Sequence, residues 1–123
     1  MKILVTDDDP SSRRFVVEAL KMTGAEVFEA ETGQQAVAAA KEKKPDLILI
    51  DHVMPEMNGF DAIKIIRHEP GLEAVPFVMI TGNYEVQTLQ EQEKFSNCAF
   101  LPKPYTVDQL MSTIEVALDR PFP

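Results

Sequence analysis

The stretch Pro45-Asp46-Leu47-Ile48-Leu49-Ile50-Asp51 contains four consecutive apolar residues and ends on an acidic one. An uninterrupted apolar run of this length is typical of a strand that is buried on both faces, as in a parallel sheet. Shorter or similar apolar runs occur at residues 3–5, 27–28, 77–80 and 99–101. We interpret all five runs as strands of one sheet.

The segments between these runs carry helix signals. Asp9-Pro10 supplies a capping residue followed by a proline, which favours a helix start, and Gly24 favours its end. An apolar stripe that includes Phe15 lies between them. Thr32 and Gln35 have the spacing of a capping box at the start of a second helix.

Three further helices are expected. Asn58-Gly59 favours a helix start, and Thr106 with Gln109 repeats the capping-box spacing. A fourth, weakly amphipathic helix is expected to begin at Asn83. Alternating strands and helices predict a (βα)5 α/β fold with right-handed crossovers, and the length fits one domain spanning residues 1–123.

Composition narrows the class of protein. Of 123 residues, 45% are apolar and 26% are charged, and the formal net charge is −8, which argues against a nucleic-acid surface. The single cysteine, Cys98, excludes an internal disulfide and fits a reducing cytosol. Its apolar neighbours indicate a core residue rather than a nucleophile. No apolar run has the length of a signal-peptide core or a membrane span.

Polar residues follow four of the five expected strands. Asp7-Asp8-Asp9 follows the first, Asp51 the third, Thr81 the fourth and Lys103 the fifth. The second ends less distinctively at Glu29-Ala30-Glu31. Because the carboxyl ends of parallel strands meet at one edge, where α/β sheets bind ligands, we expect these groups to lie together.

These residue types suit phosphoryl chemistry. Neighbouring carboxylates such as Asp7 and Asp8 repel each other, and a hard divalent cation, Mg²⁺ or Mn²⁺, removes the conflict. The Asp51 carboxylate is a potential nucleophile toward phosphorus, and Lys103 and Thr81 supply a positive charge and a hydroxyl for phosphoryl oxygens. Asp9 is interpreted as a helix cap rather than a ligand. Taken singly, each of these residues is also consistent with a structural role, as a loop acid, a surface lysine or a packing residue.

The sequence resembles the receiver domains of two-component response regulators along nearly its whole length. The resemblance is carried by residues 3–10, 45–59, 76–82 and 103–105, in this order and at these spacings. It implies a flavodoxin-like doubly wound sheet with strand order 2-1-3-4-5 and a cis peptide bond between Lys103 and Pro104. His52 departs from the apolar or aromatic residue usual at its position, and we expect it to line the rim of the site.

The resemblance also implies a role for each site residue. Asp51 would accept a phosphoryl group from a phosphohistidine of a histidine kinase or a histidine phosphotransfer protein. Mg²⁺ would be held by Asp8, Asp51 and the backbone carbonyl of Val53, with Asp7 acting through water. Thr81 and Lys103 would engage the phosphoryl group. Residues with a further implied role are the switch pair Thr81 and Phe100, although Phe100 is equally well read as a core aromatic.

Phosphorylation would then alter binding to a downstream protein through the fourth helix, the fifth strand and the fifth helix. Such a domain acts as a cytoplasmic switch rather than an enzyme with a turned-over substrate. The chain ends soon after the fifth helix, and its start at Met1-Lys2-Ile3 modestly favours a stand-alone receiver over an excised one.

Three other functions are compatible with an aspartate at the end of a parallel strand. A phosphatase of the haloacid dehalogenase type needs a second aspartate two residues after the nucleophile, where this chain has Val53. A flavodoxin needs a phosphate-binding loop after the first strand, where Asp7-Asp8-Asp9 would repel phosphate. The remaining alternative is a pseudo-receiver that binds partners without phosphorylation. A phosphorylation assay distinguishes it from a receiver that is phosphorylated on Asp51.

Overall fold

The fold is known from a computed structural model that describes residues 1–82 and 95–122. Five parallel strands form one sheet in the order β2-β1-β3-β4-β5. The strands are β1 (Lys2–Thr6), β2 (Glu26–Ala30), β3 (Leu47–Asp51), β4 (Phe77–Thr81) and β5 (Cys98–Pro102). The described helices are α1 (Pro10–Lys21), α2 (Gly33–Lys43), α3 (Gly59–Ile66) and α5 (Val107–Leu118). The predicted strand order and the doubly wound α/β class are confirmed.

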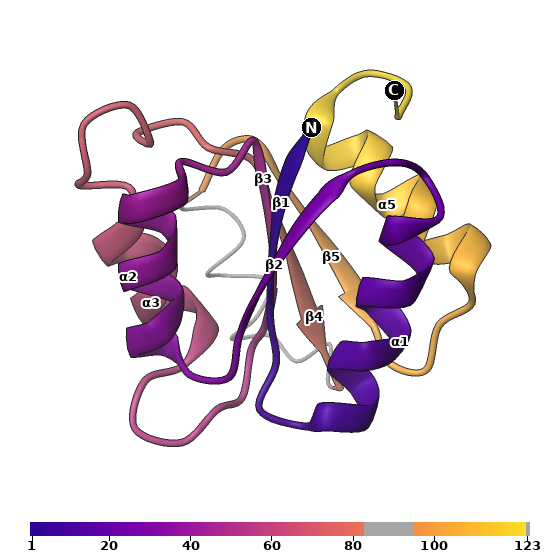
Figure 1. Ribbon diagram of the computed structural model, residues 1–123, viewed down its shortest axis with the longest axis horizontal. Helices are drawn as coiled ribbons and strands as arrows, with labels where there is room; N and C mark the ends of the chain where they lie inside the picture. The colour runs from indigo at the N-terminus through magenta and orange to yellow at the C-terminus, as the bar shows by residue number, and fades with distance from the viewer. Residues whose placement is uncertain (83–94, 123) are drawn as a thin grey trace.

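The helices cover both faces of the sheet. Helices α2 and α3 pack on one face, and α1 and α5 pack on the other (Figure 1). The central strands β3 and β4 are buried along their whole length. This explains why their sequences are continuously apolar. The edge strand β2 is less buried, and its sequence contains two glutamates.

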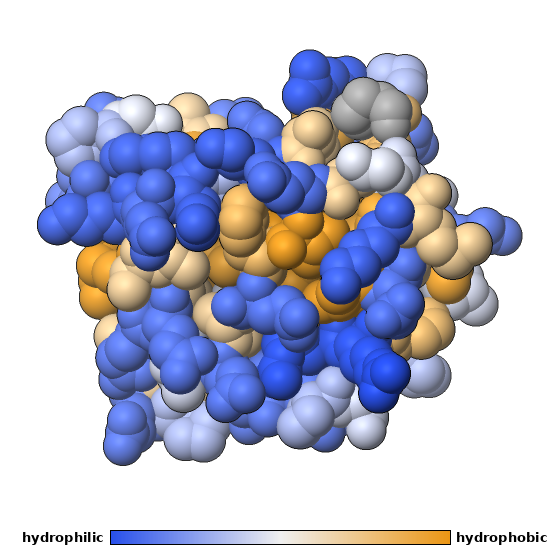
Figure 2. Space-filling model, in the orientation of Figure 1, coloured by the Kyte–Doolittle hydropathy of each residue, from blue (hydrophilic) through white to orange (hydrophobic). Residues whose placement is uncertain are grey.

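Strand register brings the chain segments of interest together. Thr6 of β1 lies beside Ile50 of β3, so the next residues, Asp7 and Asp51, leave the sheet side by side. Asp51 pairs in turn with Ile80 of β4, which places Thr81 one residue further along the same edge. In the orientation of Figure 1, this carboxyl edge is the lower end of the sheet, and Figure 2 shows a hydrophilic surface there below an apolar band.

Local helix signals are confirmed at most of the predicted positions. The side chains of Asp9, Thr32, Asn58 and Thr106 each accept a hydrogen bond as N-caps. The capping box at Thr106 is complete. The capping box at Thr32 is incomplete. The Gln35 side chain accepts a hydrogen bond from the backbone N–H of Glu31 and not from that of the cap residue Thr32.

The structure differs from the sequence pattern at Phe15. Phe15, predicted in the apolar stripe of the first helix, is 45% exposed, and Val17 is buried in its place. The Phe15 ring instead makes an edge contact with Tyr105, with ring centroids 6.0 Å apart. The helix predicted to begin at Asn83 lies outside the described residues. Among residues 1–82 and 95–122, no helix combines the length and apolarity required to span a bilayer.

Candidate functional site

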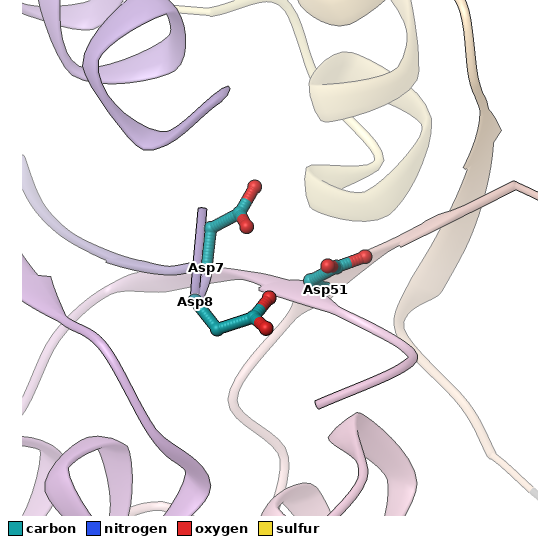
Figure 3. A group of neighbouring side chains, drawn as sticks. All are labelled: Asp7, Asp8 and Asp51. Carbon is teal, nitrogen blue, oxygen red and sulfur yellow. The ribbon is translucent and has the colours of Figure 1, made fainter. Parts of the chain in front are cut away.

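The acidic cluster is formed by Asp7 and Asp8, which follow β1, and Asp51, which ends β3. One carboxylate oxygen from each residue lies within 4.8 Å of the others. Figure 3 shows Asp7 and Asp8 at the end of one strand beside Asp51 at the end of the next, with the Asp8 side chain extending toward Asp51. Asp7 and Asp51 are 2% and 6% exposed, whereas Asp8 is exposed to solvent. The sequence therefore predicted correctly that these three residues lie together.

Burial makes the cluster electrostatically unfavourable without a counter-charge. Desolvation raises the pKa of Asp51 to about 6, an effect that Lys103 partly offsets and that Asp7 and Asp8 reinforce. Desolvation also raises the pKa of Asp7, against a hydrogen bond that its carboxylate accepts from Asp9. A divalent cation would relieve both penalties, and an all-oxygen donor set suits Mg²⁺.

Lys103 and Thr81 approach the same edge from β5 and β4. The Lys103 ammonium lies 3.3 Å from Oδ1 of Asp51, and its backbone N–H donates to the Thr81 carbonyl at 2.8 Å. Thr81 is 1% exposed. The Lys103–Pro104 peptide bond is cis, as expected. Four of the five strands thus deliver a polar group to one edge, as the sequence indicated.

The Asp9 side chain caps α1 and is not one of the three clustered carboxylates. Its carboxylate accepts hydrogen bonds from the hydroxyl and the backbone N–H of Ser12, which lower the pKa of Asp9. These bonds confirm the predicted role of Asp9 as a helix cap.

Three further residues of the predicted site, Phe100, His52 and Val53, differ in their surroundings. Phe100 is buried and its ring packs at 5.8 Å from that of Phe60. His52 is half-buried and sets its ring edge-on to the same Phe60 at 4.9 Å. Val53 is 73% exposed in the loop after β3. The geometry places these residues without assigning the roles that the resemblance implies for Val53 and Phe100.

Arg13 was missed by the sequence reasoning. It lies on α1, and its guanidinium donates to the backbone carbonyl of Asp7 at 2.7 Å. The same guanidinium bonds Glu29 and Glu31 at the carboxyl end of β2. Glu29 and Glu31 at the carboxyl end of the second strand were the available signal, but no local pattern identifies Arg13, 16 and 18 residues away, as their partner.

The fold and this edge define a class: doubly wound α/β domains with an acidic pocket at the carboxyl ends of parallel strands. The response regulator receiver domain family matches residues 3–115. The chain belongs to this family.

Individual relatives agree with this assignment. The chain is 31% identical over 117 residues to the protein PilH of Pseudomonas aeruginosa, covering 95% of this chain and 97% of PilH. It is 30% identical to the phosphate regulon transcriptional regulatory protein PhoB of the same species, but spans only 53% of that protein.

Solved structures show the same fold. The chemotaxis protein CheY4 of Vibrio cholerae is 32% identical, with a TM-score of 0.87 over 93% of this chain and 95% of that chain. The receiver domain of a sensor histidine kinase from Pseudomonas aeruginosa is 25% identical, with a TM-score of 0.84 over 96% and 97% of the two chains. In that structure a magnesium ion is coordinated in the active site cleft.

Proposed function

We propose that this receiver domain is a phosphorylation-dependent signalling switch in which Asp51 accepts a phosphoryl group from a phosphohistidine. The donor is a histidine kinase or a histidine phosphotransfer protein. The observation that carries the proposal is the setting of Asp51: a buried carboxylate, ion-paired with Lys103 at 3.3 Å and clustered with Asp7 and Asp8. A carboxylate in this setting combines a nucleophile with nearby groups that neutralise phosphoryl charge.

The transfer is a substitution at phosphorus. A carboxylate oxygen of Asp51 forms a P–O bond as the P–N bond of the phosphohistidine breaks. The electron pair of the P–N bond remains on the imidazole nitrogen, which takes a proton from solvent. Lys103 would offset negative charge on the transferring oxygens, and the Thr81 hydroxyl would donate a hydrogen bond to the bound phosphoryl group.

Asp8, Asp51 and the backbone carbonyl of Val53 would hold Mg²⁺ directly. Asp7 would contribute through a water molecule. Mn²⁺ has the same ligand preference. The fit rests on the three carboxylate oxygens that meet within 4.8 Å and on the raised pKa values of Asp7 and Asp51. When bound, the cation would neutralise negative charge on the phosphoryl oxygens.

The test is incubation with acetyl phosphate and Mg²⁺, followed by intact mass measurement. Wild type should gain the mass of one phosphoryl group, and Asp51→Asn should gain none. Asp61→Asn makes the same change at an exposed position of α3 and should be phosphorylated as wild type. No adduct on wild type, or an equal adduct on Asp51→Asn, contradicts the proposal and supports the alternative of a pseudo-receiver that works without phosphorylation.

We further propose that the output surface is formed by β5, α5 and the predicted fourth helix, of which the last lies outside the described residues. Lys103, which directly follows β5, contacts Asp51, so a change at Asp51 reaches this surface directly. A pocket lies here between the end of β5 and α5, lined by Leu101, Pro102, Pro104, Asp108, Gln109, Ser112 and Thr113.

Binding of beryllofluoride, a phosphoryl mimic, should shift the backbone amide resonances of β5 and α5. It should also change the affinity of this surface for a downstream protein. Unchanged amide shifts on this surface together with unchanged partner binding would contradict its assignment as the output surface. Receiver domains are signalling switches rather than classical enzymes, so the readout is binding and not turnover.

A further inference from the structure

Arg13 connects three segments at the carboxyl edge of the sheet. From α1 it donates through Nη1 to the Asp7 carbonyl at 2.7 Å. Its Nε and Nη2 donate to Glu29 at 3.0 Å and to Glu31 at 3.4 Å. The Arg13 side chain is only 12% exposed, so the guanidinium is largely withdrawn from water. Two carboxylates therefore fix the orientation of the group that bonds Asp7.

Asp7 is held on both sides of its backbone. Its N–H donates to the Ala30 carbonyl at 3.2 Å, and its own carbonyl accepts from Arg13. That carbonyl belongs to the peptide plane that joins Asp7 to Asp8. Fixing the plane consequently sets the direction in which the exposed Asp8 side chain leaves the chain.

Repulsion within the acidic cluster opposes this arrangement. Three carboxylates whose oxygens meet within 4.8 Å repel one another, and this repulsion favours an outward displacement of Asp8 on the loop after β1. The bond from Arg13 works against this movement before any cation arrives. Arg13 does not lie among the three clustered acids, so its effect on a cation is exerted through the backbone.

We propose that Arg13 is a positioning residue for the divalent-cation site: it preorganises the Asp7–Asp8 peptide so that the acidic cluster accepts Mg²⁺. The inference rests on the proposed function, since it concerns the same metal site. It adds the end of β2 to that site, because Glu29 and Glu31 orient the guanidinium.

The neighbouring Arg14 provides a matched control. It is exposed on the same helix and makes no ion pair with the residues that the structure describes. Arg13→Met and Arg14→Met each remove one positive charge. If charge alone mattered, either loss would tighten binding of a cation. If Arg13 positions the loop, Arg13→Met should weaken binding although it makes the protein more acidic.

The experiment is a titration of each protein with MgCl₂, followed by the amide resonances of residues 7–9 and 51 at a temperature where all variants are folded. Arg13→Met should weaken the apparent Mg²⁺ affinity about tenfold, the scale typical of lost support for metal ligands. Arg14→Met should stay within about twofold of wild type. Arg13→Lys should fall between, since an ammonium cannot reproduce the fork of the guanidinium.

A second measurement uses no metal. In the presence of a chelator, hydrogen exchange of the Asp7 and Asp9 amides should quicken in Arg13→Met relative to the amides of β4, and not in Arg14→Met. Mg²⁺ affinity in Arg13→Met equal to or tighter than in Arg14→Met, with unchanged exchange, would overturn the inference. If wild type itself binds no Mg²⁺, the proposed metal site fails, and the exchange comparison still decides whether Arg13 orders the loop.

Discussion

Asp51 occupies a position where the requirements of the site and of stability conflict. Its carboxylate is nearly buried, and desolvation raises its pKa from 3.8 to about 6. The unfolded chain loses this proton at lower pH than the folded protein does. As pH rises from about 4 to about 6, the folded state therefore becomes less stable relative to the unfolded state.

Asp51→Asn should consequently stabilise the metal-free protein at neutral pH. Asparagine does not titrate, so the variant should be more stable than wild type by about 1–2 kcal/mol at about pH 7. The gain should shrink toward zero as the pH is lowered to about 4, where Asp51 is protonated in the folded protein. Urea unfolding in the presence of a chelator across this pH range measures the difference.

Asp61→Asn is the control for this prediction. Asp61 is exposed in the first turn of α3, where a negative charge favours the helix. Its replacement should give a small loss of stability rather than a gain. A gain from Asp61→Asn equal to that from Asp51→Asn would show that overall acidity, and not burial of Asp51, is responsible.

Individual residues differ in how well the sequence predicts them. Asp7, Asp8 and Asp51 were identifiable because each follows an apolar strand, and parallel strands end at one edge. Arg13 was not, because its bonds to Glu29 and Glu31 join residues 16 and 18 positions apart. Contacts at such separations depend on how α1 packs beside β2, which no local pattern encodes.

At the scale of elements, the start of α3 is packed directly against β3. A Cβ added at Gly59 would lie 2.6 Å from the backbone oxygen of Asp51 and 2.7 Å from the sulfur of Met79. Met79 is fully buried, so it has little room to move. Glycine at this first helical position is therefore required by the close approach of two backbones.

Gly59→Ala should destabilise the protein by about 1–3 kcal/mol through overpacking, although alanine is the better helix former. It should also shift the amide resonances around Asp51. Gly82→Ala adds the same methyl group where nothing lies within 4 Å among the described atoms, and should change stability little. Thermal unfolding of both variants tests this. Equal melting temperatures for the two would refute the packing argument.

The start of α5 depends on a reciprocal pair of hydrogen bonds. The Gln109 backbone N–H donates to the Thr106 hydroxyl oxygen, and the Thr106 N–H donates to the Gln109 side chain. Thr106→Ala should lower stability by about 1 kcal/mol in denaturant unfolding.

Thr113→Ala is the control, because it removes a hydroxyl that bonds the Gln109 carbonyl within the same helix. It should be neutral or slightly stabilising, because alanine favours helix interiors. A loss of stability at Thr113 as large as that at Thr106 would contradict this assignment.

Elements were predictable where their signals are local. The caps at Asp9, Asn58 and Thr106 depend on residues within one turn, and all three form. The strand β2 was only partly visible, since its apolar run covers two of its five residues. As an edge strand it leaves Glu26 and Glu29 in water, so burial imposes no continuous apolar pattern on it.

For the whole molecule, the alternation of strands and helices predicted a parallel α/β sheet but not the order of its strands. That order followed from the family resemblance, and the observed sheet has it. Strand order depends on packing between segments that are far apart in the sequence. The sequence of one element does not specify which elements lie beside it.

Arg67 shows how separate elements are joined at the amino edge of the sheet, opposite the acidic cluster. It caps the C-terminus of α3, and its Nη2 donates to the carbonyls of Val75 at 2.7 Å and Ser96 at 2.8 Å. These carbonyls precede β4 and β5. Its guanidinium also lies over the rings of Phe77 and Phe95, at 5.0 and 5.8 Å from their centroids.

Arg67→Lys should therefore destabilise the protein although it conserves charge. A lysine ammonium lacks the planar surface that covers two rings, and it is strongly hydrated, so burial at this position disfavours it. We expect a loss of about 1–3 kcal/mol in urea unfolding. Arg120→Lys, at an exposed position after α5, should have no measurable effect. Because Arg67 lies at the far edge from Asp51, Mg²⁺ titration of the folded variant should match wild type. Weakened Mg²⁺ affinity would instead show that the two edges of the sheet are coupled.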